Sequence, residues 1–332
     1  MKRRIAIVCL LALAVSLTAS AEGKKEGSSQ KTFKLGHPRP AGTPTDNDMK
    51  AFADAVAKGT SGRIKVELYP ASQLGNYTVV QERVGLGDIE MQLAPAGTNV
   101  TKALGIASAP YLVDGFDKIP VMFARSGALM KAVDKMFEKE GIKVIGLYPK
   151  YFGGIALSKM PKDPKGMSSK GMKIRVPGIK SFEKTADALG FMATPIAFSE
   201  AFTAWQTGIV DGAIGSGAEG YWSSFRDLTK VYLPINSHLE MWFLYISLGT
   251  YNKLSVADKK VIEDAGKAVE DARFLAAPKE TAEYEKMLAG NGTTVVSFTK
   301  EELEAISKEI KKTVWPQIKE DYGVELFDSI SK

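Results

Sequence analysis

The sequence has little of the chemistry that enzymes use. Its 332 residues include one cysteine, Cys9, and two histidines, His37 and His238. The histidines are far apart and lack metal-ligand spacing. No segment carries the Gly-x-Ser-x-Gly nucleophile motif or a phosphate-binding glycine loop. We therefore predict that the protein is not an enzyme, and we expect no catalytic residue, no bound metal and no cofactor.

Concentrated charge of one sign is also missing. The chain has 44 Lys and Arg residues against 38 Asp and Glu, a formal net charge of +6. These residues are interspersed along the sequence rather than grouped in a basic stripe. This distribution argues against nucleic acid as the main partner.

Apolar runs long enough to cross a membrane are absent too. Residues 5–17 are almost wholly apolar, follow the basic residues 2–4 and precede the small-x-small pattern that ends at Ala21. A run of this length suits a signal peptide and is shorter than the roughly 20 residues of a membrane span. We therefore predict a cleaved signal peptide over residues 1–21, a polar tether over 22–31 and a periplasmic location. The longest later run, Met241–Leu248, is typical of a buried strand.

The single cysteine lies inside this leader. Val8 is larger than the residue that normally precedes a lipid-bearing cysteine, so we do not expect a lipid anchor on Cys9. Removal of the leader leaves a chain without a thiol or a disulfide.

What the sequence does contain is an alternation of strand and helix patterns, which is typical of an α/β fold. Period-two alternation predicts a strand over 64–69, and apolar spacing of i, i+3, i+4, i+7 predicts a helix over 49–56. The other expected strands are 33–35, 89–93, 143–148, 155–157, 173–176, 193–196, 210–214 and 241–248. The other expected helices are 79–86, 121–138, 179–189, 200–207, 255–287 and 300–322.

The length allows two lobes, each with its own core. We expect the first lobe to comprise residues 32–150, with about 240–275 returning to it. The second lobe should comprise 151–239, with about 276–332 returning to it. Small molecules prefer the cleft between two such lobes, because closure removes them from water.

One arginine is a candidate ligand-binding residue in this cleft. Arg175 ends the predicted strand 173–176, just before Pro177. Its planar fork suits bidentate pairing with a carboxylate. The alternative is a surface arginine in an ordinary ion pair.

Several sequence blocks resemble the solute-binding proteins of TRAP transporters, the DctP family. They occur in the order and spacing of that family and cover nearly the whole mature chain. The blocks are residues 60–75 (TSGRIKVELYPASQLG), 86–91 (LGDIEM), 170–177 (KGMKIRVP), 197–200 (AFSE) and 204–212 (AWQTGIVDG).

The resemblance implies a two-lobed, type II-like periplasmic-binding-protein fold, with a long helix within 255–287 that bridges both lobes. It also implies a membrane permease, driven by an ion gradient, as the partner of a binding protein that we expect to be a monomer. In this family the arginine of the KIRVP block grips the ligand carboxylate, and here it is Arg175. The aromatic residue of the AFSE block packs on the ligand, and here it is Phe198, for which core packing is the alternative.

Departures from the family pattern bear on the ligand. Ile155 stands where many sialic-acid and dicarboxylate binders carry a second arginine, and Gly215 stands where sialic-acid binders have an asparagine. Asn76 and Pro95 lie where those relatives have acidic residues. We therefore expect an acid with one essential carboxylate and a less polar remainder, such as a 2-oxo, aromatic or other monocarboxylic acid, rather than sialic acid.

Further residues are candidates for the wall of the site. Tyr151, Phe152 and Trp222 are expected to line the less polar remainder of the ligand, with hydrophobic packing as the alternative. His37 follows the first strand and is either a cleft residue or a loop histidine with a backbone partner. Other functions stay open: a sensor protein of the same fold, an exported hydrolase, or a family member whose ligand is not an acid.

Overall fold

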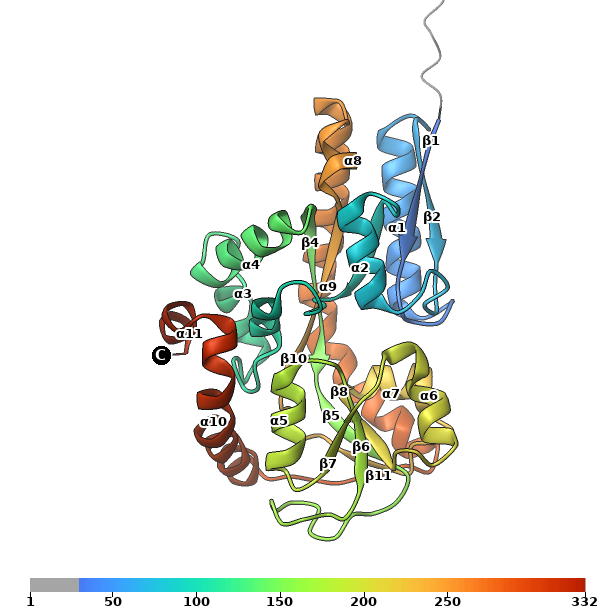
Figure 1. Ribbon diagram of the computed structural model, residues 1–332. Helices are drawn as coiled ribbons and strands as arrows, with labels where there is room; N and C mark the ends of the chain where they lie inside the picture. Colours follow the sequence, from blue (N-terminus) through green and yellow to red (C-terminus); the bar gives the residue numbers. More distant parts are fainter. Residues whose placement is uncertain (1–29, 332) are drawn as a thin grey trace, which may run out of the picture.

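The computed structural model describes residues 30–331, so the predicted signal peptide and most of the predicted tether lie outside the described residues (Figure 1). The strands are β1 Lys31–Gly36, β2 Ile64–Tyr69, β3 Met91–Pro95, β4 Ile142–Phe152, β5 Gly154–Leu157, β6 Lys173–Val176, β7 Met192–Pro195, β8 Gly212–Ser216, β9 Val231–Leu233, β10 Leu239–Ser247 and β11 Thr294–Val295. The α-helices are α1 Pro44–Gly59, α2 Tyr77–Leu86, α3 Ile119–Met122, α4 Ala128–Lys139, α5 Lys180–Ala188, α6 Phe198–Gln206, α7 Ala218–Phe225, α8 Leu248–Asn252, α9 Val256–Gly290, α10 Lys300–Tyr322 and α11 Val324–Ile330. Two 3₁₀ helices are η1 Lys102–Ser108 and η2 Phe116–Lys118.

Two separate sheets divide the molecule. The first has the strand order β2-β1-β3-β10-β4 and the second the order β11-β9-β5-β8-β6-β7. β1 pairs in parallel with β2 and β3, whereas β10 runs antiparallel between β3 and β4. We call the first sheet with its helices the first lobe and the second sheet with its helices the second lobe. The predicted two-lobed α/β fold is confirmed.

The chain crosses between the lobes at a tight junction of two segments. The backbone N–H of Gly153, between β4 and β5, donates to the carbonyl of His238 at 2.7 Å, and Ser237 N–H donates to the Gly153 carbonyl at 2.9 Å. A Cβ at Gly153 would lie 1.9 Å from the His238 ring. Only glycine allows this close approach of the two crossing segments.

The long helix α9 joins the two cores. The Ser255 side chain accepts from Asp258 N–H and caps the helix N-terminus, as the sequence predicts. Its first half buries Ile262 and Val269 in the core of the first sheet, and Leu288 near its end packs in the core of the second lobe. Figure 1 shows α9 passing from a position beside α1 down to α7, which confirms the predicted bridging helix.

Some predicted elements are displaced. The prediction of a single helix over 121–138 is wrong, because Gly127 and the turn before it separate α3 from α4. The strand expected over 89–93 begins instead at Met91. The short elements β9, α7 and α11 carry too little periodic sequence to be predicted. Within residues 30–331, no helix is both long enough and apolar enough to cross a membrane.

Candidate functional site

Arg175 is buried at the end of a central strand of the second sheet. β6 pairs with β7 and β8, and three of its four residues are buried. The Arg175 side chain is only 4% exposed, and its Nε donates to the carbonyl of Ile196 at 2.8 Å. This bond fixes the plane of the guanidinium, so the alternative of a surface arginine is excluded.

The guanidinium of Arg175 has no counter-ion in the described part of the chain, where no carboxylate oxygen lies within 4.0 Å of it. Burial lowers its pKa, and only the hydroxyls of Tyr77 and Tyr221 act in the opposite direction. Burying a charge without a partner is costly. The arrangement therefore suits a site that an anion completes.

Both lobes contribute to a cavity beside Arg175. The cavity has a volume of about 210 Å³. Its walls are formed by the residues Asn76, Tyr77, Thr78, Thr98 and Asn99 of the first lobe and Arg175, Gly178, Ile179, Pro195, Ile196, Ala197 and Phe198 of the second. A smaller void of about 30 Å³ shares Tyr77, Arg175 and Phe198 with it and reaches deeper, to Pro95 and Gly215. We call the two together the interlobe site.

Phe198 lies at the start of α6 and carries the aromatic wall of the interlobe site. The Cζ atom of Arg175 lies over its ring, 5.7 Å from the centroid, in cation–π geometry. The ring also meets Phe225 edge to face at 5.7 Å, which anchors it to the core of the second lobe. The structure thus brings together Arg175 and Phe198, the two residues that the family pattern indicates.

Gly215 and Asn76 also reach the interlobe site. Gly215 has φ +116°, and a Cβ there would lie 2.9 Å from Pro177 and 3.5 Å from the Arg175 guanidinium, so a side chain would be strained and would clash with Pro177 next to the arginine. The Asn76 amide donates to the Thr78 hydroxyl at 2.8 Å. Its Oδ1 is buried and has no hydrogen-bond donor within residues 30–331, which leaves an acceptor for a ligand hydroxyl.

Three predicted aromatic residues do not reach this cavity. Tyr151 donates its hydroxyl to Glu280 of α9, and Phe152 packs edge to face on Phe116 at 5.0 Å. Trp222 lies under the guanidinium of Arg226 at 5.6 Å. These side chains serve packing, which was the alternative for Tyr151 and Trp222, and none lines the interlobe site.

His37 likewise does not line the interlobe site. Its Nε2 lies 3.3 Å from the Asp46 carboxylate, and the side chain is buried. Burial lowers the pKa of His37 to about 4 despite this carboxylate, so the ring is neutral at pH 7. Its partner is a side chain rather than the backbone partner considered from the sequence.

Sequence reasoning missed a buried ionic cluster behind the interlobe site. Arg39 donates from Nε to Glu219 at 3.1 Å and from Nη2 to Glu240 at 2.8 Å, and Lys150 Nζ lies 2.8 Å from Glu219. Burial opposes each charge, yet Lys150 and Arg39 lower the pKa of Glu219 to about 2. The pKa of Lys150 falls to about 8, because burial outweighs the attraction of Glu219. No local motif marks these residues, since four distant segments supply them.

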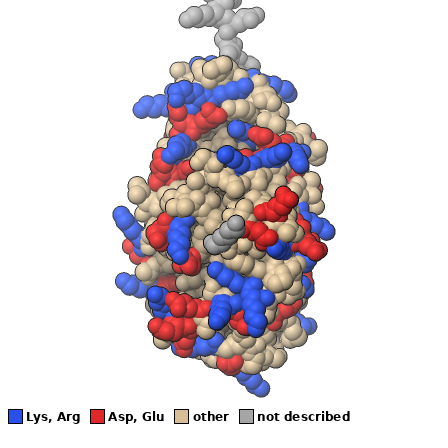
Figure 2. Space-filling view, turned by 90° about the vertical axis from the view of Figure 1, so that its left-hand side faces the viewer, with Lys and Arg blue, Asp and Glu red and all other residues tan. Residues whose placement is uncertain are grey.

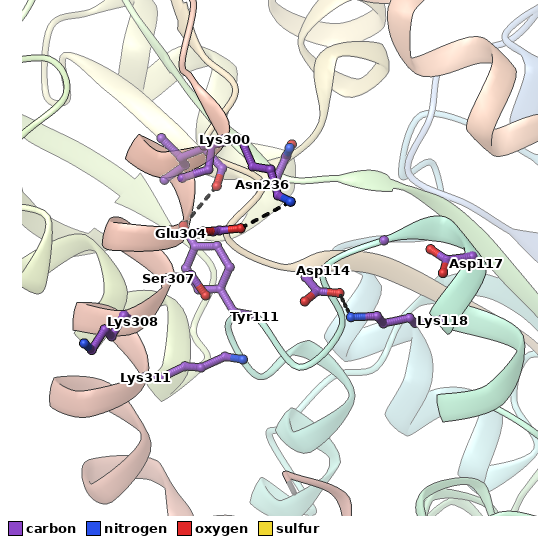
Figure 3. A pocket seen from close by; sticks show the side chains of 13 residues that line it. Tyr111, Asp114, Asp117, Lys118, Asn236, Lys300, Glu304, Ser307, Lys308 and Lys311 are labelled. Carbon is purple, nitrogen blue, oxygen red and sulfur yellow. Dashed lines mark hydrogen bonds and ion pairs between the residues drawn. The ribbon is translucent and has the colours of Figure 1, made fainter.

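A larger cavity of about 730 Å³ lies between α10 and the segment 111–118 (Figure 3). Charges of both signs line it, and two ion pairs join four of them. Lys118 pairs with Asp114 at 2.6 Å and Lys300 with Glu304 at 3.6 Å, and all four side chains are more than half exposed. Surface pairs of this kind contribute little. The cavity has no counterpart of the buried, unpaired Arg175.

The outer surface is mixed in charge as well. Figure 2 shows Lys and Arg side chains next to Asp and Glu over the visible face, without a continuous basic stripe.

Two α/β lobes joined by crossing segments, with a small cavity between them, define the class of two-lobed binding proteins. The family model of the bacterial extracellular solute-binding proteins, family 7 (DctP), matches residues 35–321. This chain belongs to that family, which comprises solute-binding proteins rather than enzymes. The resemblance read from the sequence blocks is confirmed.

Two named relatives show how widely ligands vary within the family. The sialic acid-binding periplasmic protein SiaP of Vibrio cholerae is 27% identical over 283 residues, which cover 84% of this chain and 86% of SiaP. The C4-dicarboxylate-binding periplasmic protein DctP of Rhodobacter capsulatus is 24% identical over 327 residues, which cover 96% of this chain and 94% of that protein.

Solved structures share the fold at low sequence identity. The sugar acid binding protein DctPAm from Advenella mimigardefordensis, in complex with galactonate, has a TM-score of 0.83 and 21% identity, with 91% of this chain and 97% of that chain covered. A TRAP periplasmic solute binding protein from Ralstonia eutropha, with bound (S)-2-acetolactate, has a TM-score of 0.81 and 21% identity, with coverages of 90% and 97%.

Proposed function

We propose that this protein captures a small monocarboxylic acid outside the cytoplasmic membrane and delivers it to a TRAP-type permease. The observation that carries the proposal is the buried guanidinium of Arg175, which has no counter-ion within residues 30–331. A ligand carboxylate would supply the missing negative charge at a side chain that is almost fully buried. Charge-assisted hydrogen bonds are strongest under these conditions.

The geometry of Arg175 suits a carboxylate. Its Nε is engaged by the Ile196 carbonyl, which leaves the two terminal nitrogens without a hydrogen-bond partner among the described residues. Two parallel N–H groups match the two oxygens of a carboxylate. Phe198 stacks against the guanidinium and offers an apolar surface to the carbon atoms next to the carboxylate.

The rest of the interlobe site supports a small ligand with one essential carboxylate. Ile155 is buried in β5 where many relatives have a second arginine, and Arg39 is already neutralised by two glutamates. The cavity of about 210 Å³ is below the range of about 300–1,000 Å³ that is typical of drug-sized ligands. The unpartnered oxygen of Asn76 and the nearby Thr98 hydroxyl favour an acid with a hydroxyl group.

Identification of the bound molecule tests the proposal. The protein is purified without added ligand and denatured, and the released small molecules are identified by mass spectrometry. We expect a monocarboxylic acid, recovered chemically unchanged. A neutral sugar, or a molecule recovered only in a hydrolysed form, would contradict the proposal.

A thermal-shift series gives an independent measurement. Refolded protein, freed of bound molecules, is mixed with pyruvate, benzoate, galactonate, succinate or N-acetylneuraminate. A ligand that binds the native state raises the melting temperature by mass action. We expect the largest rise with one of the first three, and a larger rise with succinate or N-acetylneuraminate would reject the single-carboxylate ligand.

A further inference from the structure

Arg39 is a first-lobe residue whose side chain enters the second lobe. It lies in the loop between β1 and α1, and its backbone carbonyl accepts from Ala71 N–H at 2.8 Å within the first lobe. Its side chain is only 1% exposed. Its Nε reaches Glu219 of α7, in the second lobe, and its Nη2 reaches Glu240 at the start of β10. The Arg39–Glu219 pair is therefore a buried ionic contact between the lobes, whereas Glu240 belongs to the first sheet.

Both carboxylates keep another partner if Arg39 withdraws. Lys150 Nζ lies 2.8 Å from Glu219, and Gly217 N–H donates to Glu240 at 3.2 Å. Lys150 and Glu240 lie close in sequence to the crossing residues Gly153 and His238, where a movement of the lobes separates groups least. Removing one partner of a buried pair is costly when the other charge is left alone. On opening, Glu219 would part from Arg39 and keep Lys150, whereas Arg39 would keep Glu240, which belongs to the first sheet.

The Arg39 guanidinium also lies against two aromatic residues next to the interlobe site. The Arg39 Cζ atom lies 5.6 Å from the centroid of the Phe198 ring and 4.9 Å from that of Trp242. The Cζ atom of Arg175 lies 5.7 Å from the centroid of the same Phe198 ring. A Cβ at Gly220 would lie 2.6 Å from Arg39 Nη2, so α7 has a glycine at the point where the arginine enters. Arg39 and Arg175 thus share one aromatic ring.

We infer that Arg39 is a reversible latch that holds the two lobes together in the closed state. Closure brings Glu219 and Phe198 of the second lobe onto the guanidinium, which Glu240 of the first lobe also holds, and opening separates Arg39 from Glu219 while Lys150 keeps that carboxylate paired. The latch goes beyond the proposed ligand chemistry, because it acts between the lobes whatever acid binds. It makes Arg39 a positioning residue for the aromatic wall of the interlobe site.

Chemical cross-linking tests the latch without a ligand. The Thr98 hydroxyl donates across the cleft to the Gly178 carbonyl at 3.2 Å, and a Cβ at Gly178 would meet nothing within 4 Å, so a cysteine there fits without a clash but does not adjoin Thr98 as a disulfide requires. A chain with Cys9→Ser, Thr98→Cys and Gly178→Cys is therefore treated with a short thiol-specific cross-linker, which joins the two cysteines only when the lobes approach. The protein is refolded to remove bound molecules, and formation of the cross-linked, trapped species is followed by mass spectrometry. Adding Arg39→Met should slow this trapping at least about tenfold, the scale for a buried charge pair.

A control within one lobe shows whether the loss of any arginine–carboxylate pair slows trapping. Arg63→Met breaks an arginine–carboxylate pair with Asp258 at 2.6 Å that lies within the first lobe, and it should leave the trapping rate unchanged. If Arg39→Met does not fold, as judged by circular dichroism, Arg39→Lys replaces it. The single nitrogen of a lysine cannot take the places of both Arg39 Nε and Nη2, so trapping should again be slower. A folded Arg39 variant that traps at the parent rate overturns the inference, whatever molecule the ligand experiment identifies.

Discussion

Two arginines that share the ring of Phe198 have opposite electrostatic surroundings. Arg39 is bonded to Glu219 and Glu240, and these carboxylates raise its pKa against the effect of burial. Arg175 has a single backbone acceptor, and burial lowers its pKa. Both side chains are almost fully enclosed. The fold therefore neutralises one buried cation with its own carboxylates and leaves the other for an anion from outside.

This difference distinguishes a buried charge that holds the structure together, that of Arg39, from one that is available to a ligand, that of Arg175. A buried pair with complete hydrogen bonding holds segments in a defined arrangement, although its net contribution to stability is often small. A buried cation without a partner destabilises the protein that carries it, and such groups concentrate at functional sites. The comparison predicts that disturbing the cluster around Arg39 changes stability, whereas changing Arg175 alters ligand affinity.

The largest expected effect is on the Arg39 side of the comparison. Glu219→Gln removes the carboxylate that Arg39 and Lys150 share. Lys150 is buried on β4 and cannot leave, so its charge loses its only carboxylate within ion-pair distance among the described residues. We expect the free energy of unfolding to fall by about 3–5 kcal/mol, the range for breaking a buried pair. Urea denaturation measures it. A loss below about 1 kcal/mol, as for a surface pair, would remove the distinction between the two arginines.

On the Arg175 side, Arg175→Ala should weaken binding of the ligand by about 2–5 kcal/mol, because the ligand carboxylate would be buried without its partner. Isothermal titration calorimetry with the acid identified in the denaturation experiment measures this change. Arg175→Lys should also weaken binding, since a point charge does not replace the planar fork. Unchanged affinity in both variants would place the carboxylate elsewhere in the protein.

The buried histidine His238 extends the comparison of buried basic side chains, because histidine, unlike arginine, can lose its charge. Burial lowers the pKa of His238 to about 3, so the folded state keeps the ring neutral at pH values where the unfolded chain, with a pKa near 6.5, binds a proton. Stability is therefore full above about pH 6.5 and falls as the pH decreases toward 3. Between pH 6.5 and pH 5 the loss is about 2 kcal/mol for this group.

Thermal or urea unfolding across this pH range measures the loss. His37, with a pKa of about 4, changes stability in the same direction. His238→Gln should flatten the profile relative to the parent protein, while His37 continues to respond. Identical pH profiles for parent and variant would show that the His238 ring does not resist protonation.

Much of the fold follows from the sequence because local signals are strong. The alternation in β2, the proline after β6 and the Thr299 capping box that begins α10 fix elements whose bounds match the predictions. Where the signal is ambiguous, prediction fails. The apolar residues of 121–138 follow a helical spacing, but the helix is interrupted and a new helix, α4, begins after Gly127.

The residues of the site, like the elements of the fold, were predicted from the sequence only in part. Arg175 and Phe198 were predicted from family blocks, and the structure places both at one cavity. Tyr151 and Phe152 were assigned to the cavity only because they are aromatic and adjacent. Nearly every residue of β4 is buried, so no period-two pattern shows which side chains face the cleft. Arg39 was missed because its partners come from α7 and β10, and only the tertiary fold brings them together.

The smallest expected effect gives the sharpest contrast between the two arginines. Arg175→Met replaces the unpaired guanidinium by an apolar side chain and leaves no carboxylate without a partner. Replacing buried charge by apolar groups is often neutral or stabilising. The free energy of unfolding of the ligand-free protein should therefore stay within about 1 kcal/mol of the parent value or rise, even though ligand binding is lost. If Arg175→Met instead destabilises the free protein as strongly as Glu219→Gln does, Arg175 has a structural partner, and its charge is not reserved for a ligand.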